Sequence, residues 1–234
     1  MTALEAAINE LINCSFFTKM TRQQITDLCQ SGTIATSCHR EVLFQSGDEA
    51  THFGIVLSGA YKLVKQTFSG EDVIVHFAIP GDVIGAFIMT QAKPTYPVTV
   101  VAMGSSRFLK IPKATYLQQW SQTPELIFRI QNSLSERMEL LQIQKALSKS
   151  SLAQKVGILL LNLKEKNTNP DLWTLPLPLT RKEIADCLGA SVESVIRVMS
   201  DWSKKGIIAT TDQQISILKP EMLVKEIHKN QKEF

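Results

Sequence analysis

Residues 179–208 read LTRKEIADCLGASVESVIRVMSDWSKKGII, and they contain the clearest local signals in the chain. Thr180 followed by Glu183 has the spacing of a capping box, in which a hydroxyl and a carboxylate accept the first free amide N–H groups of a helix. Gly189 supplies the permissive backbone that a sharp turn needs. Ser191 is placed to cap a second helix. The stretch therefore predicts two short helices joined by a tight turn.

The second of these helices has an apolar face and a polar face. At about 100° per residue, one sector collects Val195, Val198, Met199 and Trp202. The opposite sector collects Glu193, Arg197, Ser200 and Lys204. Arg can bind the O6 and N7 acceptors of guanine, Glu can accept from N4 of cytosine, and Lys can neutralise phosphate. An ordinary solvated helix face is the alternative, but the capped helix and the turn before it favour a helix that reads base pairs.

The order Thr-Arg-x-Glu-Ile-Ala-x-x-Leu-Gly-x-Ser-x-Glu-x-Val-x-Arg resembles the helix-turn-helix of the Crp/Fnr family of bacterial transcription regulators. Val192 and Glu193 with Arg197 are more similar to the Fnr side of that family than to the Crp side. Ile196 stands where Fnr-like members often have Ser. The resemblance implies a sequence-specific DNA-binding protein with a winged helix-turn-helix.

The DNA-binding residues expected from this segment are Thr180, Arg181, Lys182, Ser191, Val192, Glu193, Ser194, Arg197 and Lys204. Arg197 is expected to bind guanine and Glu193 the complementary cytosine, while Val192 is suited to a thymine methyl group. Phosphate contacts are expected from Arg181, Lys182 and Lys204.

The composition is that of an ordinary globular protein. Hydrophobic residues make up 44% of the 234 positions and charged residues 20%, which suits one large or two modest domains. The net charge of +3 does not indicate a nucleic-acid binder unless the positions of the charges are considered. The opening MTALEAAINE lacks the basic region of a secretory signal, and no apolar run approaches the roughly 20 residues that span a bilayer. We therefore expect a soluble, cytoplasmic protein with no membrane partner.

Between about residues 32 and 112 the hydrophobic period changes to two, and turn residues recur at short intervals. The expected strands include 41–45, 53–57, 61–65 and 73–78. Many short strands with evenly spaced Gly turns are typical of a jelly roll or barrel, whose interior can hold a small ligand. Residues 1–31 are helical in pattern, with Thr21 as a cap, and predict a lid of helices on the barrel.

This barrel segment is similar to the effector domain of the Crp/Fnr family in Leu43-Phe44-x-x-Gly47-Asp48, Ile55-x-x-Ser58-Gly59 and Gly81-Asp82-x-x-Gly85. The resemblance places an effector pocket at Gly85, Ala86, Tyr96, Pro97 and Thr99. Cyclic-nucleotide-binding members usually have Gly-Glu and Arg-Ser or Arg-Thr pairs there. Ala86 and the Tyr96-Pro97 pair replace them, and a buried cyclic phosphate without a cation is costly, so the sequence disfavours cyclic AMP.

The cysteines and histidines leave the cofactor unknown. The four cysteines are Cys14, Cys29, Cys38 and Cys187; they contain no CxxC pair, and Cys14 lacks the companions of an iron–sulfur cluster, which disfavours one. A thiol switch at Cys14, Cys29 or Cys38 stays open. A haem sensor needs only one or two axial ligands and also stays open, with His39, His52 and His76 as candidates. No metal site or catalytic residue is predicted.

Residues 124–149 predict a long helix, with Thr123 as its cap and Pro124 in its first turn. Apolar residues form a narrow seam of the coiled-coil type at Ile127, Ile130, Leu134, Met138 and Leu141. The seam is broadened, on the side expected to face the barrel, by Leu126, Phe128 and Leu140. A core helix of a single domain is the alternative. A helix-turn-helix protein that reads two half-sites needs a partner, which favours a two-fold dimer, and the family resemblance implies the same.

The remaining segments complete a winged helix-turn-helix. A helix is predicted at 150–166, a loop at 167–178, and a hairpin from 207–210 and 214–218 around Thr211-Asp212. A short helix and a frayed tail follow at 221–234. The fold class is α+β, divided into a sensory jelly-roll domain with N-terminal helices (1–122), a dimerisation helix (123–149) and a DNA-binding domain (150–234).

The predicted function is that of a homodimeric transcription regulator of the Crp/Fnr type that reads a near-palindromic DNA site and is not an enzyme. Its partners would be double-stranded DNA, a second copy of the chain, a small-molecule effector if one is needed, and RNA polymerase if it is an activator. The alternative is a cupin-like metal-dependent barrel enzyme with a C-terminal interaction module. Clustering of His39, His52 and His76 around a metal would favour that alternative, although the His-x-His pair usual in cupins is absent.

Overall fold

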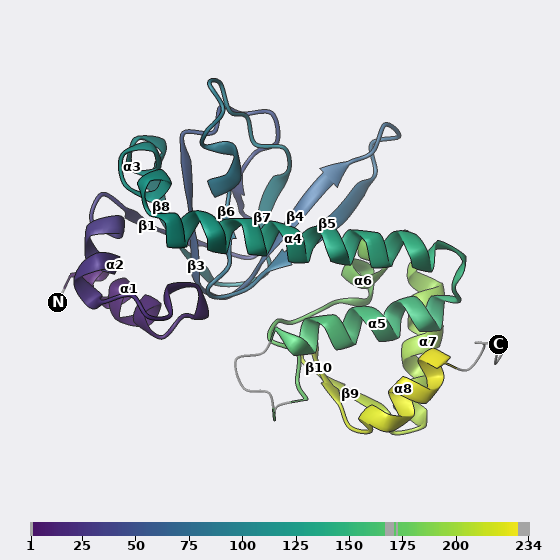
Figure 1. The fold of residues 1–234 in the computed structure, drawn as a ribbon. Coiled ribbons are helices and arrows are strands. Elements are labelled where there is room, and N and C mark those ends of the chain that lie inside the picture. The colour runs from purple at the N-terminus through teal and green to yellow at the C-terminus, as the bar shows by residue number, and fades with distance from the viewer. Residues whose placement is uncertain (1, 167–170, 172, 229–234) are drawn as a thin grey trace. The chain divides into compact units, whose positions relative to one another are not determined.

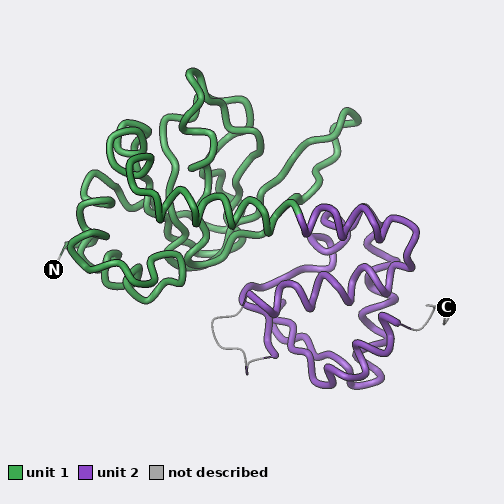
Figure 2. Tube along the Cα trace, in the orientation of Figure 1, with its two compact units in different colours: residues 1–138 green, residues 139–234 purple. Residues whose placement is uncertain are grey.

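The computed structural model describes residues 2–166, 171 and 173–228 (Figure 1). The chain separates into two compact units, residues 1–138 and 139–234 (Figure 2). The boundary lies inside the long helix α4 (Pro124–Ala146). The three-part division at 122/123 and 149/150 stays a prediction.

Two capped helices open the N-terminal unit. Helix α1 (Ala3–Ile12) begins at a Thr2 capping box, and α2 (Arg22–Cys29) begins at a capping box formed by Thr21 and Gln24. A 3-10 turn, η1 (Ser15–Phe17), joins them. The predicted helical pattern and the Thr21 cap are confirmed.

The barrel consists of two four-stranded antiparallel sheets. One has the order β1 (Thr33–Ser37), β8 (Ser106–Pro112), β3 (His52–Ser58) and β6 (Val83–Ile84). The other has the order β2 (Val42–Phe44), β7 (Thr99–Ala102), β4 (Tyr61–Gln66) and β5 (Asp72–Ala78). Three short helices complete the unit: η2 (Ala86–Ile88), α3 (Lys113–Gln118) and η3 (Trp120–Gln122). The predicted jelly roll is confirmed.

Helix α4 begins at Pro124, as predicted, but the Thr123 hydroxyl donates to the Gln119 carbonyl oxygen at 3.0 Å. Leu126 and Ile130 are buried in the core of the N-terminal unit, and Ile130 is only 7% exposed. Phe128, expected against the barrel, is 63% exposed. The positions of Ile130 and Phe128 differ from the prediction because the spacing of apolar residues shows that a helix has an apolar face, whereas packing decides which residues meet the barrel.

The C-terminal unit is a helical core with a β wing. It contains η4 (Leu147–Lys149), α5 (Leu152–Glu165), α6 (Arg181–Leu188), α7 (Val192–Lys204) and α8 (Pro220–His228). The wing pairs β9 (Ile208–Thr211) with β10 (Gln214–Ile217). Asp212 and Gln213 both have positive φ, so the turn is centred one residue later than predicted.

A third extended segment joins the wing. Trp173 accepts from the Ile217 amide at 2.7 Å, and Leu175 donates to the Ile215 carbonyl oxygen at 2.9 Å. Part of the predicted loop, residues 167–170 and 172, and the predicted tail after 228 lie outside the described residues. Within the described part of the chain, no helix is both long and apolar enough to cross a bilayer.

Candidate nucleic-acid interface

Helix α6 begins at the predicted capping box. The Glu183 amide donates to the Thr180 hydroxyl at 3.1 Å, and the Thr180 amide donates to the Glu183 carboxylate at 3.0 Å. The Thr180 hydroxyl also donates to that carboxylate, at 2.9 Å. Both side chains therefore bond to the first backbone groups of α6 and fix where the helix begins.

The turn between α6 and α7 depends on one glycine. Gly189 has φ +62° and ψ +43°, the left-handed conformation that ends a helix. A Cβ added there would meet no atom within 4 Å, so backbone conformation, and not crowding, requires the glycine. Two residues later the Ser191 hydroxyl accepts from the Ser194 amide at 3.3 Å and donates to the Ser194 hydroxyl at 2.9 Å. Ser191 and Ser194, both expected at the DNA, thus share the cap of α7.

The inner face of α7 is anchored in the core of the C-terminal unit. Val195, Met199 and Trp202 are buried, as predicted, while Val198 lies half-buried at the margin. Gly157 on α5 lets this core close: a Cβ there would lie 2.5 Å from Ile227 of α8. Sequence reasoning did not single out Gly157. The tight packing fixes which face of α7 remains at the surface.

The outer face of α7 carries Glu193, Arg197, Ser200 and Lys204, all exposed. Within the described part of the chain, no side-chain hydrogen bond or ion pair is formed by Glu193, Arg197 or Lys204. Lys205, by contrast, pairs with Asp201 at 2.6 Å and with Glu226 at 3.3 Å. The stripe can therefore meet base edges and phosphates without first breaking internal contacts. Val192 lies half-buried beside it.

The two cations at the start of α6 differ in their contacts. The Arg181 guanidinium donates to the Thr210 hydroxyl of β9 at 2.9 Å, and burial lowers its pKa. Lys182 is exposed and pairs with Asp186 one turn later at 3.0 Å. Arg181 therefore ties α6 to the wing, a contact that the sequence pattern did not reveal because Thr210 lies 29 positions further along the chain.

Two of the residues expected to form an effector pocket, Tyr96 and Thr99, are bonded within the barrel. The rings of Tyr96 and Phe44 stack with centroids 4.4 Å apart, and the Phe108 ring meets Phe44 edge-on at 5.7 Å. The Tyr96 hydroxyl donates to the His52 carbonyl oxygen at 2.7 Å. Thr99 accepts from the Ser46 amide at 3.2 Å. Aromatic rings thus occupy the space around Tyr96.

The other members of that set lie around the same strand. Ala86 is buried, and Gly85, with φ +82°, lies against Phe53 and the His52 carbonyl oxygen. Pro97 is exposed, and its carbonyl oxygen accepts from the Lys65 ammonium at 2.8 Å. Gly85 and the Tyr96 hydroxyl therefore both lie near the same atom, the carbonyl oxygen of His52.

The histidines make separate contacts. His39 Nδ1 lies 3.0 Å from the Met103 carbonyl oxygen, and His52 Nδ1 lies 2.9 Å from the Thr51 hydroxyl. His76 Nε2 lies 3.9 Å from the Asp82 carboxylate. Among the described residues, no group of three or more His, Cys, Asp or Glu side chains is placed to hold a metal ion.

The cysteines differ in accessibility. Burial raises the pKa of Cys29 and of Cys187 to about 12, and it also raises the pKa of Cys14. These thiols stay protonated at neutral pH, which disfavours reaction. Cys38 is exposed. It is the most exposed of the three cysteines that the sequence suggested for a thiol switch.

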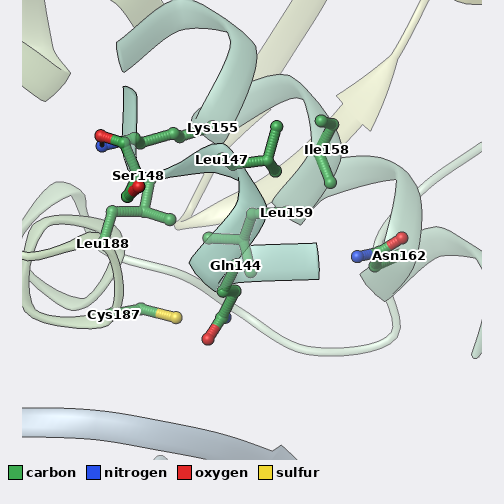
Figure 3. A pocket seen from close by; sticks show the side chains of 9 residues that line it. All are labelled: Gln144, Leu147, Ser148, Lys155, Ile158, Leu159, Asn162, Cys187 and Leu188. Carbon is green, nitrogen blue, oxygen red and sulfur yellow. Dashed lines mark hydrogen bonds between the residues drawn. The ribbon is translucent and has the colours of Figure 1, made fainter. Parts of the chain in front are cut away.

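The C-terminal unit also contains a cavity of about 280 Å³ (Figure 3). Its lining comes from the end of α4 with η4, from α5 and from α6, and includes Lys155, Asn162 and Cys187. The Lys155 ammonium donates to the Ser148 carbonyl oxygen at 3.1 Å. Sequence reasoning missed this cavity because residues drawn from three separate segments leave no periodic pattern.

Comparison with known proteins identifies the family. Residues 154–226 match the family model of the Crp-like helix-turn-helix domain, and residues 38–123 match that of the cyclic nucleotide-binding domain. The nitrogen fixation regulation protein FixK of Bradyrhizobium diazoefficiens is 32% identical over 185 residues, which cover 77% of this chain and 76% of FixK. The transcriptional activator protein Anr of Pseudomonas aeruginosa is 28% identical over 181 residues, which cover 76% of this chain and 73% of Anr.

Solved structures share the fold. FixK2 from Bradyrhizobium japonicum has a TM-score of 0.72 at 19% identity, over 83% of this chain and 96% of FixK2. A transcriptional regulator of the CRP family from Thermus thermophilus has a TM-score of 0.65 at 20% identity, over 82% and 96% of the two chains. The family consists of transcription regulators, so the barrel-enzyme alternative is set aside. The DNA-binding helix-turn-helix, the barrel and the similarity to FixK together show that the chain belongs to the Crp/Fnr family of bacterial transcription regulators.

Proposed function

We propose that this regulator acts in the cytoplasm as a homodimer that reads a near-palindromic DNA site with α7 of each subunit. The carrying observation is the outer face of α7, whose Glu193, Arg197 and Lys204 are exposed while Trp202 anchors the opposite face. A helix of this kind enters the major groove with its first turns against base edges.

Each side chain of the stripe has a role that its chemistry suits. Arg197 would bind guanine through O6 and N7, and Glu193 would accept from N4 of the paired cytosine. Lys204 and Lys182 would neutralise phosphates, and Ser191 and Ser194 at the cap would add polar contacts to the DNA backbone. Arg181 would hold the wing in position through its hydrogen bond to Thr210. Its guanidinium would still lie near the phosphates of the bound duplex.

The dimer would form along the exposed part of α4. Met138 is 61% exposed and Leu141 is 53% exposed, and Ile127 and Leu134 are half-buried on the same helical face. Ile130, which the sequence predicts in the dimer seam, is not part of the proposed interface because it is buried in its own subunit. A two-fold axis along α4 would place two reading helices in successive major grooves, about 34 Å apart.

Cyclic nucleotide is not part of the proposed mechanism. Tyr96, one of the residues expected at the effector pocket, stacks on Phe44 and stands where cyclic-nucleotide-binding relatives usually have a cation. A cyclic phosphate buried there would lack a charge partner.

A binding selection from random duplexes, carried out with the full chain at fixed salt, tests the reading function. The expected result is one enriched motif with two inverted half-sites whose centres lie about 10–10.5 base pairs apart. Enrichment of a single half-site would contradict the dimeric mode. The absence of any enriched sequence would contradict sequence-specific reading.

The dimer is tested by sedimentation of a Leu141→Glu variant, because a carboxylate in an apolar seam would be desolvated on association. We expect this variant to sediment as a monomer and to lose affinity for the two-half-site duplex. Phe68→Glu is the matched control, since Phe68 is fully exposed at the β4–β5 turn, and it should remain dimeric. A Leu141→Glu protein that remains dimeric would contradict the proposed seam.

A further inference from the structure

The cavity in the C-terminal unit has no part in the proposed DNA reading. Its volume of about 280 Å³ is close to the lower end of the range of small-molecule sites, roughly 300–1,000 Å³. A water molecule occupies about 30 Å³ in the liquid, so the space admits a ligand of about nine non-hydrogen atoms. Its walls come from α4 and η4, from α5 and from α6, as Figure 3 shows. The cavity is therefore large enough for a small organic molecule.

One face of α5 forms the floor of the cavity. Its lining residues are Lys155, Ile158, Leu159 and Asn162, at positions i, i+3, i+4 and i+7, which is the spacing of a single helical face. At 1.5 Å per residue, Lys155 and Asn162 lie about 10.5 Å apart along the helix axis. The two side chains stand at opposite ends of the lining in Figure 3. The floor is therefore apolar in its middle and polar at both ends.

The walls are mostly aliphatic. Leu147 of η4 and Leu188 of α6 face the floor, and among the described residues no aromatic side chain contributes to the lining. Gln144 and Ser148 are exposed and mark the side that is open to water. Small-molecule sites usually combine an apolar lining with a few polar groups in this way. The absence of aromatic rings from the described lining favours an aliphatic ligand over one that binds by stacking.

The charge of the lining selects an anion. Among the described residues that line the cavity, Lys155 carries the one formal charge. Its ammonium donates to the Ser148 carbonyl oxygen at 3.1 Å, and two of its three N–H donors remain for a ligand. Lys155 also lies near the N-terminus of α5, where the helix dipole favours negative charge. Burial raises the pKa of the Cys187 thiol to about 12, so this wall adds no negative charge at neutral pH.

The number of cations decides between anions. A phosphate monoester would bring a charge of about −1.5 to −2 to a single lysine and would leave much of that charge unpaired in a confined space. A carboxylate brings one negative charge, which Lys155 can match with a charge-assisted hydrogen bond. An aliphatic chain attached to that carboxylate would lie along Ile158 and Leu159 and remove their surfaces from water.

We propose that the cavity binds a medium-chain aliphatic carboxylate of about nine or ten non-hydrogen atoms, and that its occupancy changes the affinity for DNA. The DNA coupling rests on the proposed reading function, whereas the binding site does not. Leu188 is the last residue of α6 and directly precedes the turn at Gly189. A ligand seated between α5 and Leu188 therefore contacts the helix that leads into α7. It shifts DNA affinity through a difference in its own affinity for the free and DNA-bound states.

The binding test uses octanoate and the full chain. Calorimetry should give saturable binding of one octanoate per chain, and amide chemical shifts should change at the residues that line the cavity. Lys155→Gln keeps a polar side chain but removes the charge, and it should weaken binding about ten-fold or more. Lys145→Gln is the matched control, because Lys145 is exposed one position after Gln144 and does not line the cavity. It should bind octanoate as the wild-type chain does.

Two further comparisons separate this site from general adsorption. Octanamide lacks the negative charge and octylamine reverses it, so both should bind much more weakly than octanoate. Cys187→Met adds volume inside the cavity without changing its charge and should also reduce octanoate binding; denaturation of this variant and of Lys155→Gln checks that both are folded. Absence of saturable binding, equal binding by Lys155→Gln, or shifts confined to the barrel would overturn the site.

The coupling is tested with the selected duplex. Saturating octanoate should change the DNA dissociation constant about five-fold or more, and Lys155→Gln should abolish this change. By linkage, the duplex should alter the octanoate dissociation constant by the same factor. Octanoate binding with unchanged DNA affinity would overturn the coupling. A chain that binds octanoate but selects no DNA motif would contradict the reading function and support the site.

Discussion

The outer face of α7 and the interior of the barrel both contain residues that the sequence predicts as ligand contacts, and the fold treats them in opposite ways. On α7, Arg197 and Glu193 are exposed and engage no described side chain. In the barrel, the Tyr96 hydroxyl is already bonded to the backbone of β3, and the Thr99 hydroxyl to the backbone of the turn after β2. The side chains on α7 are therefore available to a ligand, whereas those in the barrel are engaged within their own domain.

This contrast shows what a binding site requires beyond the right residue types. A polar group that is hydrogen-bonded inside the fold must break that bond before it meets a ligand, and little free energy remains from the exchange. An exposed group on a rigid helix loses only water and side-chain freedom. The two sets of residues therefore differ in the number of internal bonds that a ligand would have to replace.

The largest expected effect comes from the anchor beneath the reading face. Trp202→Ala removes a fully buried indole from between α7 and α5, and truncation of a buried aromatic costs about 3–5 kcal/mol. We expect the C-terminal unit to unfold at much lower denaturant concentration and DNA binding to be lost with it. Chemical denaturation measures this, with Phe68→Ala as the exposed control. A stable, DNA-binding Trp202→Ala protein would mean that α7 does not depend on this core.

Arg197→Ala should affect binding without affecting stability. Loss of a bidentate guanine contact costs about 1–3 kcal/mol on the specific site and relaxes one position. Dissociation constants on the selected duplex and on its single-base variants measure both effects. Lys205→Ala is the matched control, because that ammonium already pairs with Asp201 and Glu226. Unchanged discrimination at every base would contradict the role of Arg197.

Tyr96→Phe tests whether the polar groups of the barrel interior serve stability and not binding. The change removes the hydroxyl that bonds to His52, and we expect the barrel to lose about 0.5–1.5 kcal/mol of stability. DNA affinity should not change, since the hydroxyl is used inside the fold. Thermal unfolding of the wild-type chain with millimolar cyclic AMP completes the test. A rise in its melting temperature would show that the barrel does bind the nucleotide.

The smallest expected effect is a change in the salt dependence of DNA binding, and it distinguishes the role of Lys204 from that of Arg181. Lys204→Ala should weaken binding uniformly across sequences and reduce the salt slope by about one, as loss of a phosphate contact does. Arg181→Ala should leave the slope unchanged and loosen the wing, because its guanidinium bonds to Thr210. Measuring affinity from low to moderate salt distinguishes the two. If both variants reduced the salt slope equally, Arg181 would contact phosphate, as the sequence predicts.

Helix α4 shows where prediction from the sequence ends. Its apolar residues recur at helical spacing, so the helix and its start at Pro124 could be predicted. The same spacing is produced by residues that face the barrel and by residues that face a partner. The structure separates them, since Ile130 is buried in its own unit whereas Met138 and Leu141 are exposed.

The helix-turn-helix shows the converse. Its capping box at Thr180 and Glu183, the left-handed turn at Gly189 and the cap at Ser191 all lie within a few residues of their partners. Local hydrogen bonds and backbone conformation depend on neighbours in the chain, so the order of residues is enough to predict them. The buried face of α7 followed from the same local period.

Contacts between distant segments could not be obtained in this way. The bond between Arg181 and Thr210, the close approach of Gly157 to Ile227 and the stacking of Phe44 on Tyr96 each join residues far apart in the chain. Residue order therefore specified the elements, the turns and the face that α7 turns outward. Packing of those elements against one another settled which polar groups are bonded inside the fold and which remain exposed, because a hydrogen bond or ring contact exists only once both partners are brought together.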